Sequence, residues 1–155
     1  MLLQSSISTR LEYQHKSLLD LIEGLNDEQV RRQTVPGKWS IFENIVHLAT
    51  YQHAFLKRIE DIVKNENPVF ERYTAETDPL FHDNCTKSTH EIIHELITTR
   101  RMMVARIFSL QADQLKKTGQ HPTFGNMTVI QWIQFFVLHE AHHLFTIFKL
   151  AAGFR

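Results

Sequence analysis

The sequence predicts an all-α protein built as a four-helix bundle. Its five glycines and four prolines divide the 155 residues into a few long segments, and each long segment repeats apolar residues at the spacing of a helix face. No stretch of useful length alternates apolar and polar residues as a half-buried strand does. With 43% apolar residues, a chain of this size can bury one core, so we expect a single domain over residues 1–155.

The first two helices are predicted from their apolar stripes and their caps. The first should run from about Leu3 to Gly24, with a stripe of Leu11, Leu18, Leu21, Ile22 and Leu25. The second should begin at Ser40, which forms an S-x-x-E capping box with Glu43, and should end near Asn65. Its stripe consists of Ile41, Ile45, Leu48, Phe55, Ile59 and Ile62.

The last two helices open with equivalent caps. Ser88 and Glu91 open the third, whose stripe is Ile92, Leu96, Met103, Ile107 and Leu110. Thr128 and Gln131 open the fourth, which should run to Gly153 through Trp132, Phe135, Phe136, Leu138 and Phe145. For the long connector over residues 66–87 we predict no regular structure, although connectors of this length are often functional.

An internal sequence repeat supports this division. The segment 25–32, LNDEQVRR, follows the first helix, and the segment 110–117, LQADQLKK, follows the third with the same order of residue types. A glycine, a large apolar residue and an N-cap then recur in GKWS at 37–40 and GNMT at 125–128. Because the match extends through the connectors, we predict a pseudo-twofold repeat of helix, turn and helix.

Composition excludes several classes of function. Basic and acidic residues are equal at 17 each, so nucleic acid is not an expected partner. No apolar run approaches the roughly 20 residues that cross a bilayer, and no signal peptide is recognisable at the N-terminus. The single cysteine, Cys85, cannot form an internal disulfide and fits a reducing compartment. We therefore expect a cytoplasmic protein without a membrane partner.

Ten histidines are an unusually large number, and histidine is the commonest metal ligand. His15, His53, His90 and His94 lie among charged residues and are expected to be solvated. His139 and His143, by contrast, lie four residues apart on one helix, where two imidazoles can reach one metal ion. Residues 139–143 match the H-E-x-x-H motif of zinc metalloproteases, but residues 144–155 contain no His, Asp, Glu or Cys that could be the downstream metal ligand. A protease is therefore disfavoured.

A third ligand must come from upstream, and His47 is the best choice. It lies beside Val46 and Leu48 at the border of an apolar stripe, where an imidazole without a partner would be costly to bury. The alternative is a core histidine bonded to a backbone carbonyl or a carboxylate. On chemistry alone the two interpretations are about equal.

The segment 37–48, GKWSIFENIVHL, resembles the W-S-x-x-E-x-x-x-H-L pattern of the DinB-like superfamily, and HEAHH at 139–143 resembles its H-E-x-H-H element. The resemblance covers nearly the whole chain. It implies a metal-binding four-helix bundle with His47, His139 and His143 as the three ligands, an open metal site and a homodimer. Many members continue with Arg-Gly-Gln where this chain has Leu144, Phe145 and Thr146, which weakens inference about the substrate.

Three imidazoles leave a coordination position open, which is typical of catalytic metal sites. The superfamily includes transferases that use a low-molecular-weight thiol, so the leading hypothesis is a metal-dependent transferase or hydrolase that activates a thiol or water against a small electrophile. Zn or Ni is the expected metal. The alternatives are a non-catalytic, stress-associated metal-binding bundle and a metal-free bundle. Tyr51, Glu140 and His142 are candidates for side chains that contact the metal ligands. The simpler interpretations are that Tyr51 is an ordinary bundle aromatic and that Glu140 and His142 face solvent.

Overall fold

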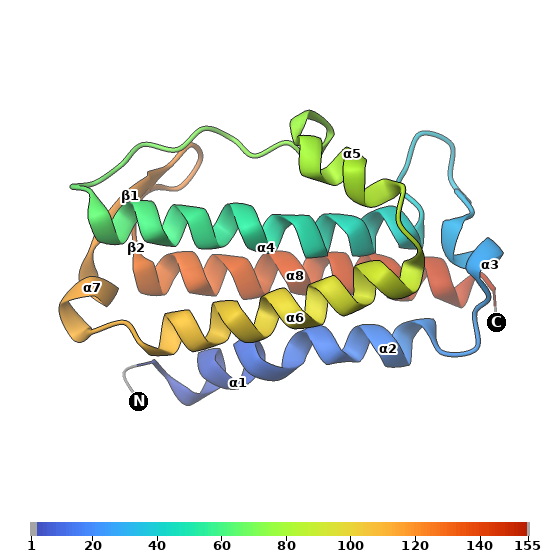
Figure 1. The fold of residues 1–155 in the computed structure, drawn as a ribbon, viewed down its shortest axis with the longest axis horizontal. Coiled ribbons are helices and arrows are strands. Elements are labelled where there is room, and N and C mark those ends of the chain that lie inside the picture. Colours follow the sequence, from blue (N-terminus) through green and yellow to red (C-terminus); the bar gives the residue numbers. More distant parts are fainter. Residues whose placement is uncertain (1–2, 155) are drawn as a thin grey trace.

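The computed structural model describes residues 3–154 and shows long helices lying side by side (Figure 1). Short helices, one hairpin and long connectors join them at the two ends and along one side. In chain order the elements are α1 (Ser5–Tyr13), η1 (Gln14–Lys16), α2 (Ser17–Ile22), α3 (Asp27–Arg31), α4 (Ile41–Lys64), η2 (Ala75–Thr77), α5 (Pro79–Cys85), α6 (Thr89–Phe108), α7 (Ala112–Lys116), β1 (Thr118–His121), β2 (Gly125–Thr128) and α8 (Val129–Ala152).

The capping boxes place the starts of the three longest helices where the sequence predicts them. At α4, the Glu43 amide donates to the Ser40 hydroxyl at 3.2 Å, and the Ser40 amide donates to the Glu43 carboxylate at 2.7 Å. Equivalent reciprocal bonds join Ser88 with Glu91 before α6 and Thr128 with Gln131 before α8. Each box satisfies backbone donors that the first turn of a helix leaves unpaired.

The first predicted helix differs from the expectation. It is divided into α1 and α2 by the 3-10 turn η1, and it covers residues 5–22 rather than 3–24. The repeated segments 25–32 and 110–117 each contain a one-turn helix, α3 and α7. The apolar residues Val30 of α3 and Leu115 of α7 are each 3% exposed. The four-helix architecture with its repeat is therefore confirmed, down to these connector helices.

The helices do not follow a simple up-and-down order. α4 packs mainly against α6 and α8, and the α1–α2 segment packs against α8 and α6. In Figure 1, α1–α2 and α8 run in one direction while α4 and α6 run in the other. The chain therefore crosses the bundle diagonally after α2 and again after α6, and the connector after α4 returns along the length of the bundle.

Two connectors contain structure that the sequence did not predict. The segment 66–87 forms η2 and α5, with Asp78 as the N-cap of α5. The segment between α7 and α8 forms an antiparallel hairpin of β1 and β2, and Val69 of the long connector makes a parallel bridge to Gln120 of β1. These two connectors therefore meet above α4 and α8.

The core consists of two apolar clusters separated by a buried polar layer. Leu11, Phe55, Met103 and Val137 belong to one cluster, and Leu18, Ala49, Leu96 and Leu144 belong to the other. Between these pairs each long helical segment contributes a buried polar side chain, namely His15, Gln52, Arg100 and Glu140.

Arg100 is the centre of this polar layer and is 1% exposed. Its guanidinium forms an ion pair with Glu140, donates to the Gln52 side chain at 2.6 Å and donates to His15 Nδ1 at 3.2 Å. Gln14 donates to Glu140 Oε2 at 2.9 Å. The layer links all four long helical segments, since a buried charge is tolerated only when it is paired and hydrogen-bonded.

The surface corrects two predictions. His15 is buried, at 5% exposed, and not solvated, because it accepts a hydrogen bond within the polar layer. In the stripe predicted for α8, Leu138 and Phe145 are each 59% exposed.

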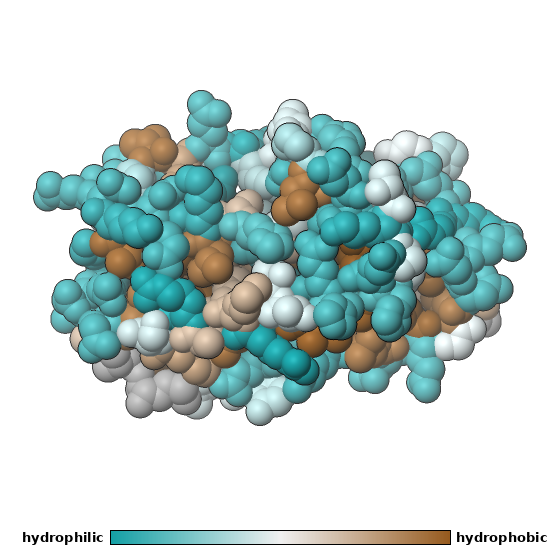
Figure 2. Space-filling model, in the orientation of Figure 1, coloured by the Kyte–Doolittle hydropathy of each residue, from teal (hydrophilic) through white to brown (hydrophobic). Residues whose placement is uncertain are grey.

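Hydrophilic side chains cover most of the face in Figure 2, with hydrophobic residues in scattered groups. Within residues 3–154, no helix has the length and apolar character needed to cross a membrane.

Candidate metal centre

Three histidines meet where α4 and α8 pack side by side. His47 lies in the second turn of α4, and His139 and His143 lie one turn apart on α8. The Nε2 atom of His139 is 3.2 Å from Nε2 of His47 and 3.2 Å from Nε2 of His143. The structure thus brings together the three residues that the sequence predicts as ligands, with one nitrogen of each directed at a common point.

The hydrogen bond of His143 assigns the roles of its two ring nitrogens. Asn44, one turn before His47 on α4, has its side-chain oxygen 2.9 Å from His143 Nδ1. An amide oxygen only accepts, so Nδ1 carries the proton and Nε2 retains its lone pair. The Asn44 amide in turn donates to the Ser40 carbonyl at 2.8 Å, which holds the asparagine in this orientation.

Burial keeps the three imidazoles neutral near pH 7. It lowers the pKa of His47 to about 3 and, with the influence of His142, the pKa of His139 to about 4. The pKa of His143 falls to about 2 through burial and its neighbouring imidazoles. Neutral imidazoles have a free lone pair for a metal, so all three side chains are in the state that coordination requires.

The donor set fits a divalent cation. Two nitrogens that each lie about 2.0–2.1 Å from a tetrahedrally coordinated ion are about 3.3 Å apart, close to the observed separations. A single proton on His139 Nε2 cannot form good hydrogen bonds to the Nε2 atoms of both His47 and His143, whereas one cation can bind all three nitrogens. The Nδ1 atoms of His47 and His139 are also buried without a hydrogen-bond partner among the described residues. The Nε2 atoms, and not these Nδ1 atoms, are therefore the nitrogens that would bind a cation.

Aromatic rings surround the three histidines. The centroid of the Tyr51 ring is 4.5 Å from that of His139, and the Trp39 ring is 5.0 Å from His47. Tyr73 reaches the site from the long connector, with its ring 5.9 Å from His47. Its hydroxyl donates to Asp78 at 2.9 Å, and burial together with this carboxylate raises its pKa. The connector is thereby held against the site by a cap residue of α5.

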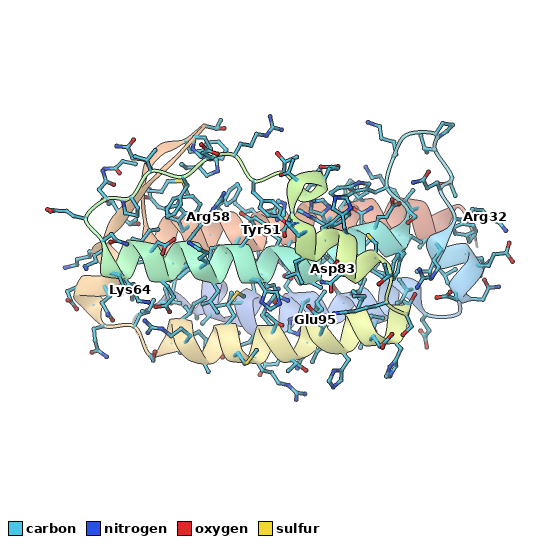
Figure 3. The ribbon with its side chains drawn as sticks, turned by 45° about the horizontal axis from the view of Figure 1, so that its top comes forward. Arg32, Tyr51, Arg58, Lys64, Asp83 and Glu95 are labelled. Atoms are coloured by element: carbon cyan, nitrogen blue, oxygen red, sulfur yellow. The ribbon has the colours of Figure 1, made fainter. Side chains whose placement is uncertain are left out.

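The triad opens into a cleft of about 740 Å³. Its walls are α4 and α8, the connector residues 72–76 and the hairpin residues 121–124. Figure 3 shows Tyr51 and Arg58 on the side of α4 that faces the connector, and both line the cleft. A second hollow of about 760 Å³ shares Trp39, Glu76 and His143 with the first and contains Lys38 and Lys149. The triad is therefore accessible beside a cavity large enough for a small molecule.

The remaining predicted residues have different positions. Tyr51 is 3% exposed and contacts two rings of the triad, so it lines the site and is not merely a bundle aromatic. Glu140 points away from the triad into the polar layer, where it is 1% exposed. His142 is exposed and lines the second hollow. The expectation that both neighbours of the ligands face solvent is correct for His142 and wrong for Glu140.

Several residues of the site were not predicted. Trp39 is only partly buried and lines both hollows. Arg58 could have been found, because residues 47, 51 and 58 fall on one face of a helix. Tyr73 and His121 lie on connectors, where no periodicity marks the inward-facing side chains.

Comparison with known proteins agrees with this architecture. A family model described as the DinB superfamily matches residues 10–147. The protein YuaE of Bacillus subtilis is 30% identical over 139 residues, which cover 79% of this chain and 83% of YuaE. A protein of Oceanobacillus iheyensis named "putative metal-dependent hydrolase OB0782" is 27% identical, with 86% of this chain and 77% of that protein covered.

Solved structures share the fold. YfiT from Bacillus subtilis, described as "a probable metal-dependent hydrolase with an unusual four-helix bundle topology", superposes with a TM-score of 0.82 at 22% identity, over 96% of this chain and 86% of YfiT. The four-helix bundle protein TT2238 superposes with a TM-score of 0.67 at 19% identity, over 92% of this chain and 95% of TT2238. Both show the same fold class as the bundle described above.

Proposed function

Because this chain belongs to the DinB superfamily, we propose that it is a metal-dependent enzyme whose divalent ion is held by His47, His139 and His143. The observation that carries the proposal is the convergence of three Nε2 atoms beside an open cleft. Three protein ligands are typical of catalytic sites, whereas structural zinc sites are usually closed by four. The names of the Oceanobacillus relatives, both "putative metal-dependent hydrolase", support the same class.

When bound, such an ion would lower the pKa of a coordinated water or thiol toward neutrality and so provide a nucleophile. The protein's own contribution is to hold the ligands and shape the cleft. Asn44 fixes the ring of His143, and the rings of Trp39 and Tyr73 limit the access of bulk water to His47. The substrate would be a small electrophilic molecule that enters between the connector and the hairpin.

Two nucleophiles are compatible with this site. Attack by water would make the protein a hydrolase, in agreement with the names of its relatives, and attack by a low-molecular-weight thiol would make it a transferase. Zn or Ni is the proposed metal, because imidazole ligands suit both. We also propose that the protein is a homodimer, because it resembles the superfamily; light scattering tests this. We propose that it is cytoplasmic, because it has a single cysteine; cell fractionation tests this.

The decisive experiment combines metal analysis with activity. Protein purified without a histidine tag should contain or take up about one equivalent of metal, and His47→Ala and His139→Ala should lose it. His94→Ala is the matched control, since it removes an exposed imidazole from α6. Consumption of monochlorobimane or an epoxide with several thiols, and hydrolysis of activated esters without thiol, should then disappear only in the two triad variants.

Two results would overturn the proposal. Stoichiometric metal without either activity would favour the non-catalytic metal-binding bundle. The absence of metal after addition of Zn²⁺ or Ni²⁺ would favour the metal-free bundle and would leave the three lone pairs without a function.

A further inference from the structure

The cleft continues from the histidine triad to a second group of polar side chains. Arg58, Arg72 and His121 line this far end, whereas the carboxylate that lines the cleft, Glu76, also borders the second hollow beside Trp39 and His143. The far end therefore has a cationic character that the triad itself does not require.

Arg58 contacts two adjacent aromatic rings and one backbone carbonyl. Its guanidinium lies 5.5 Å from the ring centroid of Phe70 and 5.6 Å from that of Trp132, and it donates to the Glu71 carbonyl at 2.8 Å. A guanidinium has five N–H donors in a rigid fork. Because one of its NH2 groups donates to the backbone and its guanidinium lies beside two adjacent aromatic rings, the orientation of the remaining donors is restricted.

Arg58 lacks the carboxylate partner that most of the other arginines with buried or partly buried side chains have; the partly buried Arg10, which donates to Gln14 and to the Val137 carbonyl, is the other exception among the described residues. Arg31 pairs with Asp27, Arg106 pairs with Glu60 and Arg100 pairs with Glu140. Within residues 3–154, no ion pair includes Arg58, although its side chain is half-buried. A half-buried, preorganised guanidinium without a carboxylate is suited to receive an anion from outside the chain.

The charge of Arg58 already acts on its neighbours. Through its charge and a side-chain hydrogen bond it opposes the effect of burial on the pKa of Tyr51, so one of its donors faces the Tyr51 hydroxyl. Its charge also opposes the effect of burial on the pKa of Tyr73, and with burial it lowers the pKa of His121. These three side chains come from α4, from the long connector and from β1, so Arg58 lies close to three of the four walls of the cleft. Arg72, which is exposed, adds a second positive charge at the rim.

We infer that this far end binds an anionic group, a carboxylate or a phosphate, of the molecule that occupies the cleft, through the free donors of Arg58 with Arg72 at the rim. The inference rests on the proposed function only for the orientation of that molecule. At about 1.5 Å per residue, residues 47 and 58 are about 16 Å apart along α4, and the arginine side chain tilts back toward the triad. The ligand would therefore have its reactive end near the histidines and its charged group toward the Arg58 end of the cleft.

The test is anion binding by the full chain, measured with and without added Zn²⁺ at constant ionic strength. Inorganic phosphate and acetate are the probes, and acetamide is the neutral control. The binding is followed by calorimetry and by the NMR signal of the Arg58 Nε–H group. We expect a saturable shift of this signal with at least one anion and none with acetamide, and a comparison of the two anions identifies the preferred headgroup.

Three variants decide the outcome. Arg58→Met should weaken binding of the preferred anion by about tenfold or more, and Arg58→Lys should recover part of it, because lysine keeps the charge but not the fork. Lys149→Met in the second hollow is the matched control and should bind as the parent does. If Arg58→Met disturbs folding, the Arg58→Lys and Arg72→Met variants provide the same comparison.

Equal anion binding in the parent and in the Arg58 variants, or binding that Lys149→Met removes, would overturn the inference. These outcomes are separate from failure of the proposed function, because the titration without metal depends on Arg58 and not on the histidines. Loss of metal binding with intact anion binding would refute only the metal enzyme.

Discussion

Asn44 of α4 accepts a hydrogen bond from Nδ1 of His143 on α8, with 2.9 Å between the two atoms. This single contact crosses the helix interface at the level of the triad and orients the His143 ring. It also determines which nitrogen of that ring faces the other two histidines.

Asn44→Ala should therefore weaken metal binding by about 10- to 100-fold, the usual cost of removing a partner that orients a metal-bound histidine. Competition with a chromophoric chelator measures the affinity. Asn44→Asp is the informative companion, since it keeps an acceptor for His143 but loses the donor to the Ser40 carbonyl. It should lower the free energy of unfolding while holding metal more tightly than the alanine variant; an equal loss of affinity in both variants would contradict the orienting role.

Glu140→Gln should destabilise the protein strongly. It leaves the Arg100 charge without its partner in the polar layer, and breaking a fully buried pair in this way costs about 3–5 kcal/mol. The free energy of unfolding is measured by urea denaturation. Glu60→Gln is the control, because it breaks the more exposed pair with Arg106 and should cost no more than about 1 kcal/mol. Similar losses in the two variants would mean that water reaches Arg100.

The stability of the metal-free protein should decrease as the pH falls below about 6.5. Burial and the positive charge of Arg100 lower the pKa of His15 to about 3 in the folded state, from an ordinary value of 6.5. Between these values the unfolded chain binds a proton that the folded chain does not, so stability is complete above pH 6.5 and declines toward pH 3. Each such histidine contributes a slope of up to about 1.4 kcal/mol per pH unit.

His15→Asn tests the share of this residue, since the asparagine oxygen can replace the ring nitrogen that accepts from Arg100. The slope of the unfolding free energy between pH 6 and 4 should decrease by up to about 1.4 kcal/mol per pH unit relative to the parent. An unchanged slope would show that His15 is protonated in the folded protein.

Gly119→Ala should destabilise the junction of the hairpin with the core. An added Cβ would lie 2.7 Å from Cγ1 of Ile62 and 2.9 Å from the ring of Phe70, closer than packed carbon atoms can approach. Overpacking of this kind costs about 1–3 kcal/mol. Thermal or urea unfolding measures the loss. Gln120→Ala on the same strand is exposed and should change stability by less than about 0.5 kcal/mol; equal effects would argue against the close approach.

Much of the fold could be predicted because the signals are local. The capping boxes of α4, α6 and α8 each join residues three positions apart, so they specify helix starts without knowledge of the rest of the chain. The spacing of His139 and His143 likewise places both on one face of a helix in any tertiary arrangement. Local signals are therefore enough to predict the fold class, the starts of the three longest helices and the proximity of His139 and His143.

The residues that each helix face contacts depend on how the helices pack together. His15 and Glu140 have polar neighbours in the sequence, yet both are buried, because His15 is hydrogen-bonded and Glu140 is ion-paired to Arg100 of α6. Tyr73 and Arg58 lie at the cleft because the long connector and the hairpin close over α4. The reason is physical: hydrogen bonds within a helix join residues a few positions apart, whereas burial and ion pairing depend on partners brought close only by the packing of whole helices.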